Sequence, residues 1–306
     1  MTTVAAALAA ARAKLPASEA HLLLGQVMRQ GPAWLIAHDD ELFDEDTLLA
    51  FAALVARRAG GEPVAYLLGY REFFGRRFAV SPAVLIPRPE TELLVELAKA
   101  RVGAGALCVP GNPLARREAE SRVCRDRGQV TPSILDLGTG SGCIAITLAL
   151  ELPLSRVTAV DSSGAALQVA AGNAQALGAS LRLLRGDWLS GLAGECFDLI
   201  VSNPPYVAAA DAHLAQGDLR HEPRQALVGG ADGLDAIRNI VAAASSHLAP
   251  GGSLMIEHGH DQANAVRGLM GDAGFEDIKA HADLAGILRV TAGGLPSAGG
   301  APADSH

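Results

Sequence analysis

Cysteine is scarce in this chain, and its pattern excludes two common uses of the residue. The 306 residues include four cysteines, with no Cys-x-x-Cys pair and no histidine at ligand spacing: Cys108, Cys124, Cys143 and Cys196. A zinc site or a disulfide framework would need such pairs, so neither is expected and no metal is predicted. Reduced thiols are typical of cytosolic proteins, which favours a cytoplasmic location.

Positively charged residues are also few. Lys and Arg number 25 against 33 Asp and Glu, which leaves a net charge of -8. Sequence-independent binding of nucleic acid depends on Lys and Arg that neutralise phosphates, so the balance favours a protein or small-molecule substrate. No apolar run approaches the roughly 20 residues that span a bilayer, and the first residues lack the basic-then-apolar order of a signal peptide. We expect a monomeric cytoplasmic protein that makes no contact with membranes.

Length and a hydrophobic content of 49% allow one large domain and one small one. Apolar residues recur at helical spacing at first and then at strand spacing, which predicts a helical domain at 1–72 and a β-hairpin linker at 73–88. An α/β domain is expected at 89–291. Residues 105–130, rich in Gly, Pro and Arg, are expected to form a surface-loop insertion, and 292–306 a disordered tail.

The large domain alternates between strand patterns and helix patterns. Strands are expected at 134–137, 157–160, 181–184, 197–202 and 253–256. Such alternation predicts the α/β class with a doubly wound parallel sheet. In such sheets ligands bind outside the carboxyl ends of the strands, so the residues that follow each strand are the candidates for a site.

A glycine-rich turn follows the first of these strands and opens a helix. It reads Gly138-Thr139-Gly140-Ser141-Gly142, after Asp136. Glycines allow close approach of a ligand, and the start of a helix offers unpaired N–H groups. The dinucleotide pattern needs its last Gly or Ala where this chain has Cys143, so the turn favours S-adenosylmethionine over NAD.

Acidic and aromatic residues end the next two strands. Asp161 can accept hydrogen bonds from both hydroxyls of a ribose, although Asp161-Ser162-Ser163 is also a fair helix cap. Asp187 offers a carboxylate for an exocyclic amine and Trp188 an indole face for an adenine ring. A turn role for Asp187 and a core role for Trp188 are the alternatives.

The fourth strand ends in Asn203-Pro204-Pro205-Tyr206. The Asn203 side-chain oxygen and the Pro204 carbonyl can each accept one N–H of a planar amino group, while Tyr206 stacks on it. A simple turn is the alternative, because Asn-Pro commonly starts turns. These contacts would align the nitrogen for methyl transfer without a dedicated general base. Three other titratable residues near expected strand ends are assigned surface or structural roles: Glu222, Glu257 and His258.

Taken together, these motifs resemble class I S-adenosylmethionine-dependent methyltransferases that modify planar amino groups. Up to about residue 291 the chain is more specifically similar to the bacterial release factor glutamine methyltransferases, the HemK/PrmC family. The motifs that carry this likeness lie at 62–69, 71–75, 86–92, 136–142, 186–188, 201–206, 232–234 and 256–259.

The resemblance implies a Rossmann-like, seven-stranded sheet with an N-terminal helical domain that recognises the substrate. It implies methyl transfer from S-adenosyl-L-methionine to the side-chain amide nitrogen (N5) of the glutamine in the Gly-Gly-Gln motif of peptide-chain release factors. The product would be S-adenosyl-L-homocysteine, and the modification would modulate translation termination. Residues 138–142, Asp161, Trp188 and Asn203 would touch the cofactor, and Asn203, Pro204, Pro205 and Tyr206 would grip the glutamine.

Two other functions stay open at this point. An adenine-N6 methyltransferase acting on DNA or RNA would use the same Asn203 grip and would need base flipping, with the Arg-rich residues 116–127 as a phosphate contact. The acidic balance and the lack of a basic recognition domain speak against it. A non-catalytic adaptor that binds release factor or ribosome is the third reading, and the intact set of motifs from 138 to 206 argues against it.

Overall fold

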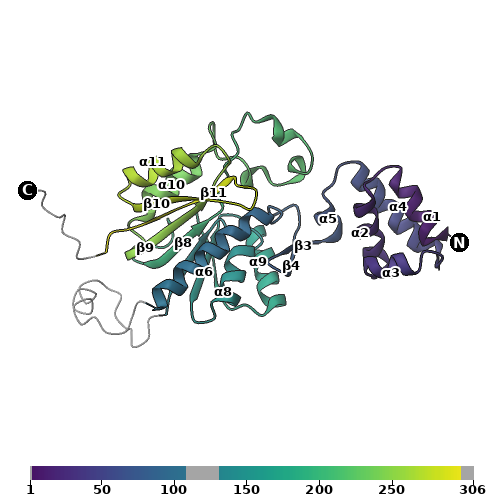
Figure 1. Ribbon diagram of the computed structural model, residues 1–306, viewed down its shortest axis with the longest axis horizontal. Coiled ribbons are helices and arrows are strands. Elements are labelled where there is room, and N and C mark those ends of the chain that lie inside the picture. Colours follow the sequence, from purple (N-terminus) through teal and green to yellow (C-terminus); the bar gives the residue numbers. More distant parts are fainter. Residues whose placement is uncertain (1, 108–130, 298–306) are drawn as a thin grey trace, which may run out of the picture.

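The computed structural model describes residues 2–107 and 131–297, which form two bodies joined by a connector (Figure 1). The arginines at 116–127 and most of the expected tail lie outside the described residues. Within the two described ranges, no helix combines the length and the apolar character needed to cross a bilayer.

The N-terminal body is a small helical bundle. Its elements are α1 (Val4–Arg12), α2 (Ala17–Met28), α3 (Pro32–Ala37) and α4 (Glu45–Ala59), with a two-residue strand pair, β1 (Thr2–Thr3) and β2 (Leu42–Phe43). The Asp44 side chain accepts a hydrogen bond from the Thr47 N–H at 2.7 Å and so caps α4. Leu23, Leu24 and Leu35 are fully buried in the bundle core.

The connector, residues 64–91, consists of α5 (Val64–Leu68), a hairpin of β3 (Tyr70–Phe73) and β4 (Arg76–Ala79), and a stretch that ends in the 3₁₀ turn Pro89–Thr91. Tyr70 pairs with Ala79, so the hairpin begins three residues before the expected boundary at 73. The reason is local: Gly69 ends α5 in the left-handed region, at a φ of 78°, and the chain becomes extended at once. Phe73 and Phe78 then bury their rings in the core of the large domain.

The large domain contains the expected doubly wound α/β sheet. Its strands are β5 (Ser133–Leu137), β6 (Arg156–Asp161), β7 (Arg182–Arg185), β8 (Phe197–Ser202), β9 (Leu248–Glu257), β10 (Glu276–Ala282) and β11 (Leu288–Gly294), in the order β10-β11-β9-β8-β5-β6-β7. Among the described strands of this sheet, β11 runs opposite to the other six and is therefore antiparallel to both β9 and β10. Because β11 pairs with β9 as far as Gly294, residues 292–294 of the expected tail are sheet instead.

Helices cover both faces of this sheet (Figure 1). On one face lie α6 (Glu92–Leu107), α8 (Cys143–Glu151) and α9 (Gly164–Leu177); on the other lie α10 (Asp235–Ala244) and α11 (Ala263–Asp272). Successive residues of β5 alternate between the two cores, Ile134 in the first and Leu135 in the second. The expected loop insertion starts later than residue 105, because α6 continues to Leu107.

Polar groups connect the bundle to the large domain. Arg58 of α4 forms ion pairs with Glu19 of α2 at 2.7 Å and with Asp218 of the large domain at 2.9 Å. The Arg220 guanidinium donates to the Gly60 carbonyl at 2.8 Å. Asp218 and Arg220 belong to the segment that follows Tyr206, so this segment touches both domains.

Asn173 of α9 fastens the connector to the first turn of the sheet. Its side-chain oxygen accepts from the Ala79 N–H at 2.7 Å, and its amide nitrogen donates to the carbonyls of Ala79 and Ser141 at 3.0 and 2.8 Å. The side chain is buried, so these bonds are shielded from water. The Asn173 side-chain amide thus fixes the position of β4 relative to the glycine-rich turn.

We expect Asn173→Ala to lower the free energy of unfolding by about 2 kcal/mol, because it leaves the Ser141 carbonyl without its buried donor. Urea denaturation followed by circular dichroism measures the change. The exposed Gln175 on the same helix provides the matched control, since Gln175→Ala should shift stability by less than about 0.5 kcal/mol. Equal stability of the two variants would show that Asn173 does not fasten the connector.

Candidate active site

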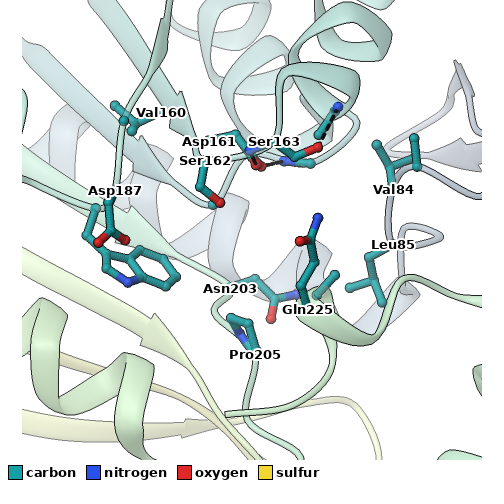
Figure 2. Close-up of a pocket in the computed structure, with 17 residues that line it drawn as sticks. Val84, Leu85, Val160, Asp161, Ser162, Ser163, Asp187, Asn203, Pro205 and Gln225 are labelled. Atoms are coloured by element: carbon teal, nitrogen blue, oxygen red, sulfur yellow. Dashed lines mark hydrogen bonds between the residues drawn. The ribbon is translucent and has the colours of Figure 1, made fainter. Parts of the chain in front are cut away.

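The carboxyl ends of β5, β6, β7 and β8 meet at one edge of the sheet and enclose a pocket. Figure 2 shows Asp161, Ser162 and Ser163 on one side, Asn203 and Pro205 on another, and Val84 and Leu85 of the connector across from Asp187. Gly138, Gly140 and Trp188 also line it. The structure therefore brings together most of the residues singled out in the sequence, although they come from four different strands.

The glycine-rich turn owes its shape to backbone that other residues rarely adopt. Gly142 has a φ of 82°, and a Cβ there would lie 2.7 Å from Ile146 Cδ1. The N–H groups of Gly138 and Thr139 both donate to the Val160 carbonyl, at 2.9 and 3.1 Å. The turn is therefore tied to the end of the neighbouring strand β6.

Asp161 connects the turn to the following helix. One carboxylate oxygen accepts from the Gly140 N–H and the other from the Ser163 N–H, both at 2.8 Å. Ser163, not Asp161, is the N-cap of α9, because its hydroxyl accepts from the Ala166 N–H at 3.2 Å. The N-cap role considered for Asp161 is therefore filled by Ser163. Each carboxylate oxygen keeps further lone pairs for a ligand in the pocket.

Asp136 lies behind the turn and is fully buried. Its Oδ2 accepts from the Thr139 hydroxyl at 2.6 Å, while its Oδ1 has no hydrogen-bond partner in the described part of the chain. Burial raises the pKa of Asp136 to about 7, and the nearby Asp161 adds to this, against the opposing effect of Thr139. Near neutral pH this carboxyl is therefore partly protonated.

Trp188 closes the pocket beside the turn. Its backbone is left-handed, with a φ of 50°, and a Cβ placed on Gly138 would lie 3.4 Å from Trp188 Cζ3. The indole is partly buried and lies over the glycine, so it is not simply a core residue. A left-handed, non-glycine residue at a ligand site is a known form of local strain. Asp187, its neighbour, is exposed at the rim.

Asn203 is held firmly but is not fully satisfied. The strand end before it is locked by the Ser202 hydroxyl, which donates to the Leu137 carbonyl at 2.8 Å. The Asn203 amide nitrogen donates to the Thr91 hydroxyl at 3.1 Å. Its side-chain oxygen is buried and has no hydrogen-bond partner among the described residues. Such an acceptor calls for a donor that arrives with a ligand.

The remaining predicted residues support the pocket without lining it. Thr139 and Ser141 are buried in the turn, Gly142 packs on α8 and α9, and Pro204 is buried behind Asn203. The Tyr206 hydroxyl donates to Glu257 Oε1 at 3.5 Å, and burial raises the pKa of Tyr206. Stacking of Tyr206 on a planar group therefore stays a prediction.

Several residues of the pocket escaped the sequence reasoning. Val84, Leu85 and Gln225 line it, and Figure 2 shows the Gln225 side chain directed into it. The connector supplies the first two, and its Val84 packs in one cluster with Ala166 and Val169 of α9, a tertiary contact with no local signal. Gln225 lies in a short 3₁₀ turn, Arg224–Ala226, and nothing in the sequence distinguishes it.

The surface role considered for three titratable residues is wrong, because all three are buried: Glu222, Glu257 and His258. His258 has a structural role. Its Nε2 lies 2.9 Å from the Thr291 hydroxyl and its Nδ1 2.9 Å from the Gly259 carbonyl, and burial lowers its pKa. Glu222 accepts from the Ile86 N–H at 3.0 Å and pairs with Arg88. It therefore pins the connector to the segment that follows Tyr206.

Known proteins match both bodies of the chain. Residues 125–270 match the family model of the methyltransferase small domain, and residues 1–69 match the model of the PrmC N-terminal domain. The release factor glutamine methyltransferase of Bordetella pertussis is 49% identical over 282 residues, which cover 92% of this chain and 96% of that protein. The protein of the same name from Burkholderia pseudomallei is 47% identical, with 92% and 93% covered.

Solved structures share the fold at low identity. The catalytic domain of hMettl16, in complex with an RNA hairpin, superposes with a TM-score of 0.53 at 15% identity, covering 81% of this chain and 84% of that one. A T. thermophilus 16S rRNA N2 G1207 methyltransferase, in complex with AdoMet and guanosine, has a TM-score of 0.50 at 20% identity, with 74% and 49% covered. These two likenesses show the fold alone.

The sheet order, the antiparallel last strand and the glycine turn facing Asp161 define a class I S-adenosylmethionine-dependent methyltransferase. Near-complete alignment with relatives at 47 and 49% identity narrows the class further. The chain belongs to the release factor glutamine methyltransferase family.

We expect Glu222→Gln to lower the free energy of unfolding by about 2 kcal/mol, because the half-buried Arg88 loses its counter-charge. Thermal unfolding measured by calorimetry tests this. Glu96→Gln is the matched control: the Glu96 side chain is 59% exposed and forms an ion pair with Lys99 at 3.4 Å, so its loss should cost less than about 0.5 kcal/mol. A Glu222→Gln variant as stable as the wild type would contradict the pinning role.

Proposed function

We propose that this protein transfers a methyl group from S-adenosyl-L-methionine to the side-chain amide nitrogen of the glutamine in the Gly-Gly-Gln motif of peptide-chain release factors. The observation that carries the proposal is the buried, unpartnered side-chain oxygen of Asn203 at the edge of the pocket. An amide NH2 group is a donor that can satisfy it. The names of the relatives that span the chain support glutamine as the source of that group.

The pocket residues fit the methyl donor chemically. Asp161 keeps lone pairs for ribose hydroxyls, Asp187 offers an acceptor for an exocyclic amine, and Trp188 offers an indole face for the adenine. The turn at 138–142 supplies close backbone approach at a helix start. When bound, S-adenosyl-L-methionine supplies an electrophilic methyl group on a sulfonium, and S-adenosyl-L-homocysteine remains after transfer.

The chain's own residues have to make an amide nitrogen nucleophilic. Its lone pair is delocalised into the carbonyl, so the N–H bonds must be drawn toward acceptors while the nitrogen faces the methyl group. The Asn203 side-chain oxygen takes one N–H. The backbone carbonyl of Pro204, which stands between the pocket-lining Asn203 and Pro205, takes the other. Alignment of this kind can remove on the order of 7 kcal/mol from a barrier. The surplus proton of the methylated amide is acidic enough to pass to water.

The domains divide the work in this proposal. The N-terminal helical domain recognises the release factor, and the large α/β domain carries out the transfer. Arg58 and Arg220, which link the bundle to the segment after Tyr206, keep the two parts in contact. Because release factors act where proteins are made, we propose a cytoplasmic enzyme. We also propose that it works as a monomer.

An adenine-N6 methyltransferase is the less favoured alternative. It could use the same Asn203 oxygen, but the relatives at 47 and 49% identity carry the release factor name. A non-catalytic adaptor would not need a pocket lined by Gly138, Asp161, Trp188 and Asn203.

Replacing Asn203 tests the proposal directly. With labelled S-adenosyl-L-methionine and a release factor, the wild type should methylate the glutamine of Gly-Gly-Gln, and Asn203→Ala should lower kcat by at least about 100-fold, the scale of losing one preorganised transition-state contact. Cofactor affinity, measured by calorimetry, should change little. The exposed Asn264 gives the control, since Asn264→Ala should keep full activity. Label on DNA adenine instead of release factor would overturn the function.

Replacing Asp161 tests the cofactor side separately. We expect Asp161→Ala to weaken the binding of S-adenosyl-L-homocysteine by about 10- to 100-fold, because a charged acceptor for hydroxyls and for the Gly140 N–H is lost. Equilibrium binding measured by calorimetry gives the ratio. Asp272→Ala, at an exposed position on α11, should bind as the wild type does. Unchanged affinity in Asp161→Ala would remove this residue from the cofactor site.

A further inference from the structure

Thr91 contacts the polar side chain that matters most at the substrate end of the pocket. It is buried, with 2% of its surface exposed, and it ends the 3₁₀ turn Pro89–Thr91 that begins α6. Its hydroxyl oxygen accepts from the Asn203 amide nitrogen at 3.1 Å. The two residues lie 112 positions apart in the sequence.

The hydrogen bond with Thr91 determines which end of the Asn203 amide is left over. The NH2 end donates to the Thr91 hydroxyl, so the opposite end, Oδ1, faces away from Thr91. It is this oxygen that is buried and has no hydrogen-bond partner among the described residues.

We propose that Thr91 is a positioning residue that holds the Asn203 amide by its NH2 end, so that its oxygen faces the substrate NH2 group. The inference rests on the proposed function and extends it. In the reverse orientation Asn203 would present its own NH2 group to the substrate NH2, donor against donor, and no hydrogen bond would form. The tetrapeptide at 203–206 thus depends on a hydroxyl supplied by the connector.

Isosteric variants of Thr91 test the hydroxyl. Thr91→Val keeps the shape but removes the acceptor, and we expect kcat on release factor to fall by about 100-fold, the scale of misplacing one preorganised contact. Thr91→Ser restores a hydroxyl and should stay within about 5-fold of the wild type, while both variants bind S-adenosyl-L-homocysteine normally. Thr147→Val is the matched control, because Thr147 is fully buried and its hydroxyl has no partner among the described residues.

A Thr91→Val variant as active as Thr147→Val, or a Thr91→Ser variant as poor as Thr91→Val, would each overturn the proposal.

The outcomes also distinguish a failure of this inference from a failure of the proposed function. A wild type that fails to methylate release factor glutamine, and whose complex with S-adenosyl-L-homocysteine fails to bind a Gly-Gly-Gln peptide, would overturn both. If the wild type methylates glutamine and the Thr91→Val variant is equally active, the positioning role alone is overturned.

Discussion

Buried hydrogen bonds between the connector and the catalytic edge of the sheet hold this protein's site together. Glu222 accepts from Ile86, Asn203 donates to Thr91, and Asn173 joins Ala79 to Ser141. Each bond links segments far apart in the sequence, and each is at least partly shielded from water, where an unmade bond is costly. Without them the connector would have no fixed place, and the pocket would lose the wall formed by Val84 and Leu85.

The same bonds couple the two ends of the pocket. At one end, Asp161 holds Gly140 and Ser163, which sets the shape of the glycine turn. At the other end, the connector fixes Asn203 through Thr91. Methyl transfer needs both ends at a set separation, because an in-line displacement tolerates little misalignment of donor and acceptor. A rigid parallel sheet is a suitable frame, since the ends of its strands are fixed relative to one another by the ladder of hydrogen bonds.

The parts of the fold that follow local patterns were predictable. The strand expected at 197–202 matches β8, and the helix expected after Gly142 begins at Cys143, because apolar runs and glycine turns report buried strands and helix starts directly. The family was reachable as well, from motifs at fixed spacing. Boundaries that depend on pairing partners were not predictable from the sequence. The sequence places Tyr70 in the helical domain and residues 292–294 in a tail, whereas pairing with Ala79 and with β9 makes both of them strand.

The sequence by itself determined the alternation of strands and helices, the glycine turn and the Asn-Pro-Pro-Tyr motif, because each depends on residues that are neighbours in the chain. Only the tertiary structure decided that Asn203 is oriented by Thr91, that Glu257 is buried beside Tyr206, and that Val84 and Leu85 close the pocket. Those features join segments separated by 50 or more positions: Tyr206 and Glu257 lie 51 residues apart, and Thr91 and Asn203 lie 112 apart. Such contacts form only when the whole core packs, so no local pattern records them.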